Sequence, residues 1–266
     1  MTEGSQPPAG VDVTVPAAAR MYDYWLGGHD NFAADRVAAL KITERAPGTP
    51  AAARANRRFL GRAVRHLAGE AGIRQFLDLG AGLPTNGNVH QVAREVTPDA
   101  RVVYVDNDPM VITHARALET GDAVAVIHAD LRDPDTILRH PDTRRLIDFT
   151  KPLAILFVSV LHFVPEPDAH TAVAAFTSAA APGSHLAASH GYDDQDPQAA
   201  ATTTTVYAST ASPVTRRTRA EILAFFDGLE ILEPGLVPVQ QWRPDEHDPP
   251  GLSKAWILGG VGRKPA

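Results

Sequence analysis

The sequence has no cysteine among its 266 residues, which excludes a disulfide framework, a thiolate metal site and a cysteine nucleophile. Apolar runs of membrane-spanning length are also missing, and residues 2–10 (TEGSQPPAG) lack the basic and apolar regions of a secretion signal. Neither sign of charge dominates, because the formal net charge is only −6. We therefore expect no nucleic-acid or membrane partner. Together, these absences predict a cytoplasmic protein.

The chain is predicted to consist of a tail, a helical cap and one larger domain. Residues 1–15 are rich in proline, glycine and small polar residues, which is typical of a disordered tail. Residues 16–72 contain three helical patterns, the first closed by Gly27 and Gly28 and the second capped by Asp30 or Asn31. Residues 73–266 form the larger domain, and the polar stretch 193–214 interrupts it as a partly helical insertion.

The third helical pattern, which starts near Pro50, is amphipathic and basic. Its apolar side is expected to face the core. Five arginines lie on the opposite side: Arg54, Arg57, Arg58, Arg62 and Arg65. Such a face is most often solvated, and less often it binds an acidic partner.

A third glycine is missing from the loop after the first predicted strand. Residues 75–85 (QFLDLGAGLPT) read as a short buried strand that ends in Gly80 and Gly82, and a helical pattern follows Asn88. Dinucleotide-binding loops have the spacing G-x-G-x-x-G, in which the third glycine brings the helix onto the strand. Here the loop lacks it, and Asp78 precedes the first glycine. A carboxylate at this strand tip suits a ligand with a cationic amine, such as S-adenosylmethionine (SAM), better than a diphosphate.

Acidic residues end the next two predicted strands. Residues 101–106 form the second strand, and Asp106 at its end can accept hydrogen bonds from both hydroxyls of a ribose. This contact is common to SAM and NAD. The third strand ends at Asp130, whose carboxylate can accept from the exocyclic amine of adenine or, alternatively, cap the following helix. The sequence therefore predicts a ligand that contains adenosine.

The later part of the chain completes the predicted sheet. The most continuously apolar run, residues 152–164, indicates a central strand covered on both faces, and His162 lies at its end. His190 ends the next strand. After a helix capped by Thr215 or Thr218, strands at residues 230–239 and 253–261 form an antiparallel hairpin. We therefore predict an α/β fold with a mostly parallel seven-stranded sheet, a C-terminal antiparallel hairpin and an N-terminal helical extension.

This succession of motifs resembles the Rossmann-like class I SAM-dependent methyltransferase fold. Seven segments are similar to an actinobacterial family of S-adenosyl methyltransferases that was long filed as a domain of unknown function: YDYWLGGHDNFAADR, ARANRRFLGRAV, GIRQFLDLGAGLPTNGNVH, RVVYVDNDP, ADLRDP, VLHFVP and PGLVPVQQWRP. The similarity extends from Pro16 to the C-terminus. It implies a SAM-dependent methyltransferase with SAM as its cofactor and leaves the acceptor unidentified.

The resemblance also implies which residues contact the cofactor. Gly80 and Gly82 are expected at the methionine part of SAM, Asp78 near its ammonium group and Asp106 at its ribose. The full set of expected cofactor-binding residues is Asp78, Gly80, Gly82, Asp106, Asn107, Asp130, Leu131, Ser159, Val160 and His29. Apart from His29, these residues follow the C-terminal ends of parallel strands, where ligands of open α/β sheets lie.

Methyl transfer from a sulfonium needs neither a metal nor a covalent nucleophile, because the leaving group is a neutral thioether and positioning supplies most of the effect. A hydroxyl or amine acceptor would benefit from a base with a pKa near neutral. His162 and His190 are the candidates, with a hydrogen-bonded packing role as the alternative for each. Tyr24 and His29 are expected to close over the site as part of a lid, residues 16–31. No metal site is predicted, because no H-E-x-x-H spacing occurs.

Three functions remain open on the sequence alone. The leading one is a methyltransferase that acts on a small molecule, because the helical cap and the insertion could together roof a pocket. The second is a SAM-binding regulator or sensor without transfer activity. The third, an NAD-dependent oxidoreductase, is disfavoured by the missing third glycine and by the terminal hairpin.

Overall fold

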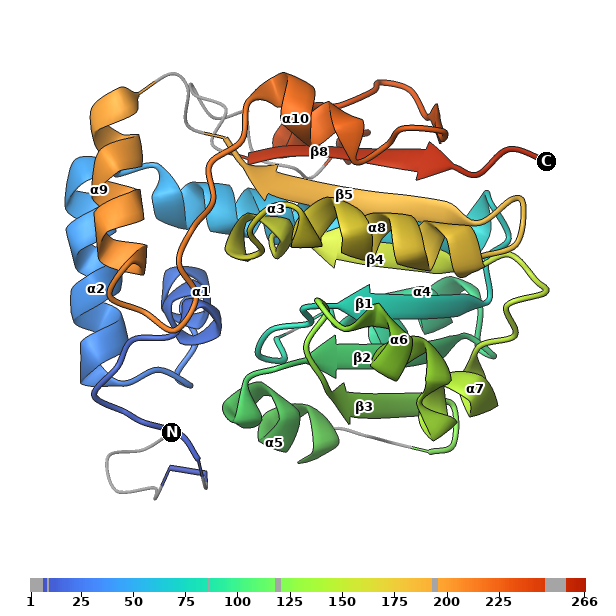
Figure 1. Cartoon of the computed structure of the whole chain (residues 1–266), viewed down its shortest axis with the longest axis horizontal. Helices are drawn as coiled ribbons and strands as arrows, with labels where there is room; N and C mark the ends of the chain where they lie inside the picture. Colours follow the sequence, from blue (N-terminus) through green and yellow to red (C-terminus); the bar gives the residue numbers. More distant parts are fainter. Residues whose placement is uncertain (1–6, 9, 86, 118–120, 193–195, 247–256) are drawn as a thin grey trace.

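A computed structural model describes residues 7–8, 10–85, 87–117, 121–192, 196–246 and 257–266. A central sheet carries helices on both faces, and a further helical layer stands across one end of it (Figure 1). The predicted α/β class is confirmed. Parts of the predicted tail (residues 1–6 and 9), of the insertion (193–195) and of the hairpin (247–256) lie outside the described residues.

Five parallel strands form the main part of the sheet. They are β1 (Gln75–Leu79), β2 (Arg101–Asp106), β3 (Val124–His128), β4 (Ala154–Val158) and β5 (His185–Gly191). Their order is β3-β2-β1-β4-β5, so the chain reverses its direction of progress between β1 and β4. A crevice for ligands is expected beyond the C-terminal ends of the strands at such a reversal.

Within the described residues, the sheet contains eight strands rather than the predicted seven. The stretch predicted as one strand, residues 230–239, instead forms β6 (Glu230–Ile231) and β7 (Val237–Pro238), and both pair antiparallel with β8 (Ile257–Arg263). Pro234 cannot donate a ladder hydrogen bond, and Gly235, with a φ of 91°, turns the chain between the two short strands. β8 lies next to β5, also antiparallel, as the predicted C-terminal topology requires.

Helices cover the two faces of the sheet. On one face lie α3 (Thr49–Gly69), α4 (Val89–Val96) and α5 (Pro109–Ala117), and on the other lie α6 (Pro134–Arg139), α7 (Pro141–Leu146), α8 (Asp168–Ala179) and α10 (Arg219–Ala224). Side chains of β1 alternate between these layers, with Phe76 in the first core and Leu77 in the second. Thr218 caps α10 together with Glu221, as predicted.

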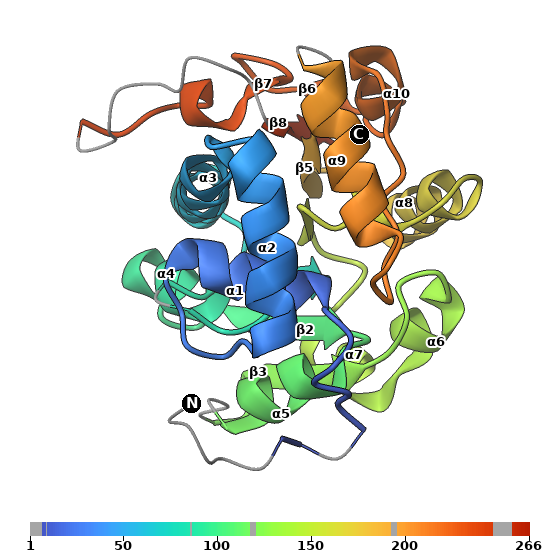
Figure 2. The ribbon, with the colours of Figure 1, turned by 90° about the vertical axis from the view of Figure 1, so that its left-hand side faces the viewer.

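A third helical layer stands across the ends of the parallel strands (Figures 1 and 2). It consists of α1 (Ala18–Leu26), α2 (Ala33–Arg45) and α9 (Pro197–Tyr207), the last of which comes from the predicted insertion. Their common core includes Met21, Trp25, Ile42, Val206 and Tyr207. The N-terminal cap and the insertion therefore form one structure, although about 150 residues of the sheet domain separate them in the sequence.

The basic side of α3 is only partly solvated. Arg62 is buried, and it donates from Nε to the carbonyl of Trp242 at 2.9 Å and from Nη2 to the carbonyl of Val239 at 2.6 Å. Arg54 donates to the carbonyl of Trp25 at 3.2 Å. The expected solvated face is therefore wrong for Arg62, which fastens α3 to the C-terminal part of the chain.

Candidate active site

A cavity of about 640 Å³ lies beyond the C-terminal ends of the parallel strands. Its floor consists of the loops after β1 to β4, and α1, α3 and α9 contribute the opposite walls. This volume is in the range of about 300–1,000 Å³ that is usual for small-molecule sites. Every expected cofactor-binding residue except His29 lines the cavity, and so does His162, whereas His190 and Tyr24 do not.

The loop after β1 requires its glycines. Gly80 and Gly82 have φ angles of 76° and 67°, a region that residues with a side chain rarely adopt. A Cβ atom at Gly80 would lie 2.3 Å from Cγ2 of Val160, whereas nothing lies within 4 Å of a Cβ at Gly82. The N–H of Gly82 donates to Oδ2 of Asp106 at 2.9 Å. The loop is thus packed against the tip of β4 at Gly80 and leaves open space at Gly82.

Asp78 brings a buried carboxylate to the cavity wall. The residue is 5% exposed, and no hydrogen bond or ion pair reaches its carboxylate from the residues that the structure describes. Burial raises the pKa of Asp78 to about 7, while the charge of Arg57 lowers it and that of Asp106 raises it further. A cationic group bound in the cavity would favour the ionised form of this carboxylate.

Arg57 of α3 lies close to Asp78 and was grouped, on sequence alone, with a solvated face. Its Nη2 donates to the carbonyl of Gly87 at 3.0 Å and to Oδ1 of Asn88 at 3.1 Å. Its Nε is buried and has no acceptor among the described residues. Arg57 lines the cavity and therefore offers a fixed positive charge with one unused donor.

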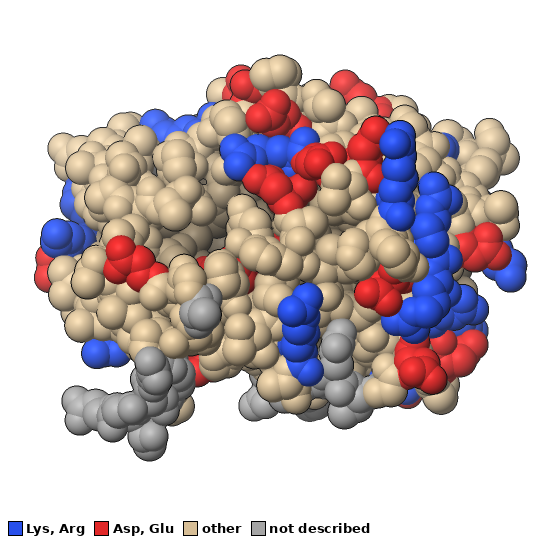
Figure 3. Space-filling model, turned by 60° about the horizontal axis from the view of Figure 1, so that its bottom comes forward, with Lys and Arg blue, Asp and Glu red and all other residues tan. Residues whose placement is uncertain are grey.

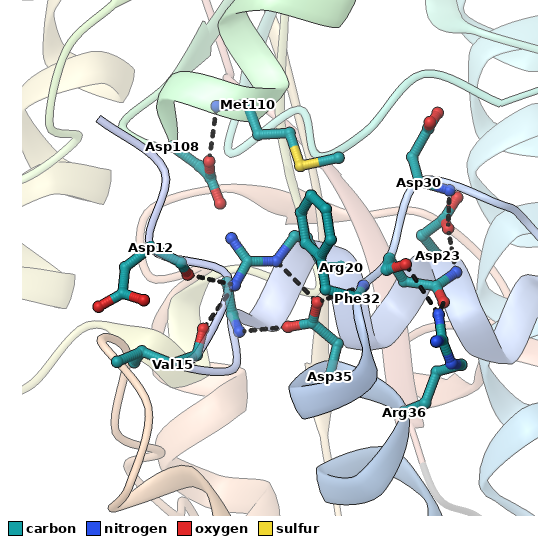
Figure 4. A network of polar contacts seen from close by, with 12 residues as sticks. Asp12, Val15, Arg20, Asp23, Asp30, Phe32, Asp35, Arg36, Asp108 and Met110 are labelled. Atoms are coloured by element: carbon teal, nitrogen blue, oxygen red, sulfur yellow. Dashed lines mark hydrogen bonds and ion pairs between the residues drawn. The ribbon is translucent and has the colours of Figure 1, made fainter. Parts of the chain in front are cut away.

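Asp106 is held by backbone N–H groups at the tip of β2. Its two carboxylate oxygens accept from Gly82 and from Asp108, each at 2.9 Å. Burial raises the pKa of Asp106, and these hydrogen bonds oppose the rise. Asp108 has a different role, because its carboxylate caps α5 by accepting the N–H of Met110 at 2.8 Å (Figure 4). Asn107, between the two acids, is exposed and lines the cavity.

The carboxylate of Asp130, after β3, is engaged by Arg132. Nε of Arg132 lies 3.0 and 2.9 Å from the two carboxylate oxygens, and this pairing is the main reason why the pKa of Asp130 is lowered. The alternative role as a helix cap belongs to Asp133, which caps α6. The backbone N–H of Leu131 has no acceptor among the described residues and lies at the cavity wall. An adenine edge would therefore find an unused donor here.

Ser159, at the tip of β4, has a strained backbone. Its φ is 56°, and its Oγ is buried without a hydrogen-bond partner among the described residues. Its N–H donates to the carbonyl and to Oγ of Ser189, at 3.1 and 3.0 Å. A non-glycine residue in this region costs of order 1–3 kcal/mol and persists where its surroundings hold it, commonly at functional sites.

A chain of hydrogen bonds connects the tip of β4 to the helical layer. Ser189 donates from Oγ to Oδ1 of Asn56 at 2.6 Å, and Asn56 donates from Nδ2 to the hydroxyl of Tyr22 at 2.9 Å. Tyr22 in turn donates to the carbonyl of Ala53 at 2.9 Å. Tyr22 and Asn56 line the cavity, so this chain fixes α1 and α3 relative to the ends of β4 and β5.

His162 lies in a 3₁₀ turn, η1 (Leu161–Phe163), that follows β4. Its Nδ1 accepts the N–H of Gly191 at 3.3 Å, so the proton of the neutral ring is on Nε2. Burial lowers the pKa of His162 well below its usual value, and the nearby His190 and Arg217 lower it further. At neutral pH, His162 is therefore an uncharged hydrogen-bond donor on the cavity wall.

His190 is buried behind the wall, with both ring nitrogens engaged. Its Nδ1 donates to the carbonyl of Gly191 at 2.7 Å, and its Nε2 accepts from Nη1 of Arg217 at 3.0 Å. Burial lowers its pKa to about 4. Arg217 also donates to the carbonyls of Leu161 and Val164, both at 2.8 Å, and to Glu166 at 2.7 Å. Arg217 therefore fixes the loop that carries His162.

The start of α1 is fastened to α2 by a buried ion pair. Nε of Arg20 lies 2.8 Å from Oδ2 of Asp35, and Arg20 also donates to the carbonyls of Asp12 and Val15 (Figure 4). Asp35 additionally accepts the N–H of Phe32 at 2.8 Å, so it caps α2. The predicted cap by Asp30 or Asn31 is wrong, because α2 starts one or two residues later than expected and Phe32 is at its N-cap position.

The loop between α1 and α2 is organised by Asp23. Its Oδ2 accepts from the N–H of Asp30 at 2.9 Å and from Nδ2 of Asn31 at 2.8 Å (Figure 4). Burial raises the pKa of Asp23. Asp23 lines the cavity, whereas His29 is exposed and Tyr24 lies beside the apolar core of the helical layer. From this segment, Tyr22 and Asp23 therefore line the cavity, whereas the predicted residues Tyr24 and His29 do not.

Comparison with known proteins adds a family to this geometry. The sequence profile of the S-adenosyl methyltransferase family matches residues 4–265. The chain belongs to this family. A crystal structure of a candidate methyltransferase from Thermobifida fusca YX shares 48% sequence identity with this methyltransferase at a TM-score of 0.91, covering 98% of this chain and 99% of that one. No curated protein matches the chain.

Two further solved structures support the family and the fold. A protein from Streptomyces avermitilis MA-4680, assigned to domain-of-unknown-function family 574, shares 41% identity at a TM-score of 0.92 and covers 96% of the methyltransferase and 99% of its own chain. The N-methyltransferase NodS from Bradyrhizobium japonicum WM9 shares 15% identity at a TM-score of 0.50, over 79% and 97% of the chains, which indicates a common fold only.

The protein is therefore a SAM-dependent methyltransferase of class I fold, and the NAD-dependent oxidoreductase left open by the sequence is excluded. The residues present fit SAM. Its amine needs a carboxylate, its carboxylate needs a cation and its adenine edge needs a backbone donor. Asp78, Arg57 and Leu131 each offer an unused group of the required kind on the cavity wall.

Several wall residues of the methyltransferase were missed on sequence alone. Asn56, Arg57, Asp23 and Tyr207 all line the cavity, and each belongs to the helical layer or to α3. Only contacts between segments far apart in the chain bring them there, such as the Asn56–Ser189 hydrogen bond across 133 residues. The insertion offered a signal, because an irregular segment in a regular fold often carries specificity.

Proposed function

We propose that this SAM-dependent methyltransferase transfers the methyl group to a small molecule enclosed between the strand ends and the helical layer. The observation that carries the proposal is the tight connection of the roof to the floor. The N–H of Thr215, just after the insertion, donates to the carbonyl of His162 at 2.7 Å, and Asn56 joins α3 to β5. A polymeric acceptor would have to displace these contacts, whereas a small molecule need not.

The cofactor roles follow from the unused groups on the wall. SAM supplies an electrophilic methyl group on a sulfonium. We assign the methionine ammonium to Asp78 and the methionine carboxylate to Arg57, because opposite charges then face each other. Asp106 accepts from the ribose, and the open space over Gly82 allows close approach. The remaining contacts are assigned to Asn107, Asp130 and Leu131 at the adenine, and to Ser159 and Val160 at the methyl end.

The geometry favours catalysis by positioning over general base catalysis by a histidine. His162 presents an Nε2–H when neutral, which orients an acceptor atom with a lone pair rather than removing a proton. His190 supports the loop through Arg217 and does not line the cavity. Tyr24 and His29 are proposed to act through the movement of the α1–α2 segment, not by contact with the acceptor.

Surface features agree with a small-molecule substrate. On the face in Figure 3, the basic side chains, including a band of them on the right-hand side, are bordered by acidic ones, so the surface is mixed in charge rather than uniformly basic. Among the helices that the structure describes, none is long and apolar enough to cross a membrane.

Substituting Asp106 tests the cofactor site. In Asp106→Ala, we expect SAM to bind at least tenfold more weakly, because two charge-assisted hydrogen bonds to the ribose are lost, each worth roughly 1.5–3 kcal/mol and not fully additive. Calorimetry with SAM and with its demethylated product measures the change. Asp99→Ala, at an exposed ion pair with Arg74, serves as the control and should bind like the parent. Equal SAM affinity in Asp106→Ala would remove Asp106 from the site.

Cofactor binding should also order the lid, residues 16–31. Asp23 and Tyr22 reach the cavity wall from α1, so a ligand that contacts them should slow local opening of this segment. We expect slower amide hydrogen exchange in residues 16–31 when SAM or its product is added. Helix α8 lies away from the cavity and provides the internal control. Unchanged exchange in the lid would show that α1 and α2 are static packing helices.

The size class of the acceptor can be tested without knowing its identity. Methyl-labelled SAM is incubated with the enzyme and a cell extract, and the extract is then separated by size. We expect the label in the small-molecule fraction only, and about tenfold less of it with Asp106→Ala when the SAM concentration is below the Kd of the parent. Label in proteins or nucleic acids would refute the proposed function. SAM binding without label in any fraction would indicate the sensor alternative.

A further inference from the structure

Tyr207, in the last turn of the insertion helix α9, carries an unused polar group on the cavity wall. The residue is 6% exposed and lines the cavity, yet its hydroxyl has no partner among the described residues. Burial raises the pKa of Tyr207, and so does the nearby Tyr22. The hydroxyl therefore remains protonated and can both donate and accept a hydrogen bond.

Two more uncharged groups stand near the tip of β4. Oγ of Ser159 is buried without a partner, and Nε2 of His162 carries the ring proton. Phe163 separates these groups from Tyr207. Its ring centroid lies 4.3 Å from that of His162 and 5.2 Å from that of Tyr207. The apolar ring of Phe163 is thus flanked by His162 on one side and by Tyr207 on the other.

The surroundings of this surface disfavour a charged acceptor. The wall residues packed around Tyr207 and Phe163 include the apolar side chains of Trp25, Leu26 and Val214. His162 is neutral at physiological pH because it is buried. An ionised group would lose its hydration here without gaining a counter-charge from these residues, which costs several kcal/mol.

We propose that the acceptor is an uncharged aromatic compound with two oxygen substituents, one a hydroxyl that receives the methyl group beside Ser159 and His162, the other bound by Tyr207, with the ring against Phe163. This inference rests on the proposed function and names its substrate class. The hydrogen bonds from Ser159 and His162 stabilise the charge that develops on the hydroxyl oxygen during transfer and so oppose the rise in its pKa that burial causes.

The reaction balances without another reactant. The aromatic hydroxyl releases its proton to water, and its oxygen uses an electron pair to form the new O–C bond with the methyl carbon. The S–C bond of the sulfonium breaks, and its electron pair stays on sulfur as the neutral thioether. Ser159 and His162 hold the oxygen in line, while Tyr207 sets the distance of the ring from the cofactor.

A panel of four compounds on the same ring tests the class. The compounds are a naphthalene diol with its hydroxyls at opposite ends, the corresponding naphthol, the hydroxynaphthoate and the aminonaphthalene. Methylation is followed by formation of the product thioether, and binding is followed by equilibrium dialysis with the demethylated cofactor present. We expect the diol to form a methyl ether, with a kcat/KM about 2- to 12-fold above that of the naphthol, as one additional hydrogen bond predicts.

Tyr207→Phe should remove this preference. The diol should fall to the level of the naphthol, the naphthol should be unchanged, and the Kd for SAM should stay within twofold of the parent. Thr205→Val, which removes an exposed hydroxyl from the same helix α9 outside the cavity wall, should leave all three values unaltered. A loss of equal size for both compounds, or no loss for either, overturns the subsite at Tyr207.

Different results would overturn the proposed acceptor class and the proposed function. Faster methylation of the hydroxynaphthoate to an ester, or of the amine, overturns the acceptor class but leaves a small-molecule methyltransferase. The same holds if labelled products from an extract of Streptomyces avermitilis, the source of one relative, lose their label on alkaline hydrolysis, because esters are cleaved and aryl ethers are not. Absence of label from the panel and from the small molecules of the extract overturns both.

Discussion

Replacing Asp78 with asparagine should stabilise the ligand-free protein and weaken its binding of SAM. The carboxylate has a pKa of about 7 in the folded protein because it is buried, against an ordinary value of 3.8. One pKa unit corresponds to about 1.4 kcal/mol, so ionised Asp78 lowers the free energy of unfolding by up to about 4 kcal/mol above pH 7. Asparagine occupies the same volume without the charge.

The stability difference between Asp78→Asn and the parent should depend on pH. The pKa is raised on folding, so the folded state binds the proton more tightly, and the destabilisation by Asp78 grows as the pH rises from about 4 to 7. We expect urea unfolding of Asp78→Asn and of the parent to agree near pH 4 and to differ most at pH 8. If the free energies of unfolding of the two proteins differed by the same amount at every pH in this range, the prediction would be contradicted.

SAM binding by the same variant should change in the opposite direction. The ammonium of SAM loses its counter-charge in Asp78→Asn, which should weaken binding about 10- to 100-fold at pH 8. In the parent, the affinity should fall as the pH is lowered from 8 to 6 and Asp78 takes up a proton, while the variant should show little change. Asp135→Asn, at an exposed ion pair, is the control for a lost carboxylate.

Replacing Arg217 with methionine should destabilise the fold by about 3–5 kcal/mol, because buried carbonyls and Nε2 of His190 lose their donor, each at a cost of about 1–3 kcal/mol. The side chain of Arg217 is 2% exposed and has four acceptors, the carbonyls of Leu161 and Val164, the carboxylate of Glu166 and Nε2 of His190. Methionine reaches a similar length but satisfies none of them. Urea unfolding followed by tryptophan fluorescence measures the loss.

An exposed arginine provides the matched control. Arg139 pairs with Asp135 on the surface of α6, where both side chains are largely solvated, so Arg139→Met should change the free energy of unfolding by less than about 1 kcal/mol. Similar losses for the two substitutions would mean that the contacts of Arg217 add no more than those of a surface pair. The folded fraction of Arg217→Met should also retain SAM binding, because Arg217 touches none of the proposed cofactor residues.

The parts of the fold that could be predicted from sequence are those set by local patterns. Short apolar runs correctly predicted strands β1 to β5. The acidic residues at the ends of these strands predicted the floor of the cavity, because parallel strands place their C-terminal ends on one edge of the sheet. Gly27 and Thr218 marked a helix end and a helix start correctly. The eighth strand was missed because Pro234 divides a stretch whose apolar residues continue on both sides of it.

The roof could not be predicted in the same way. Whether an arginine on α3 meets water, the cavity or a distant carbonyl depends on the segment that covers it, and Arg57 and Arg62 have the same helical periodicity as their solvated neighbours. The roles of the histidines depended equally on tertiary contacts. A single N–H, from Gly191, determines which nitrogen of His162 carries a proton, and Arg217 occupies the free nitrogen of His190.

The fastening of α3 by Arg62 has a consequence for biosynthesis. During synthesis, Arg62 leaves the ribosome 180 residues before Trp242, whose carbonyl accepts its hydrogen bond in the folded protein. Helix α3 therefore emerges before the acceptor that allows the guanidinium of Arg62 to be buried. Until the C-terminal segment appears, the nascent chain must keep this charge in water, and the apolar side of α3 can dock on β1 and β4 only incompletely. Emergence of the segment around Trp242, rather than of strands β1 to β3, should therefore be the step at which the protein becomes resistant to protease.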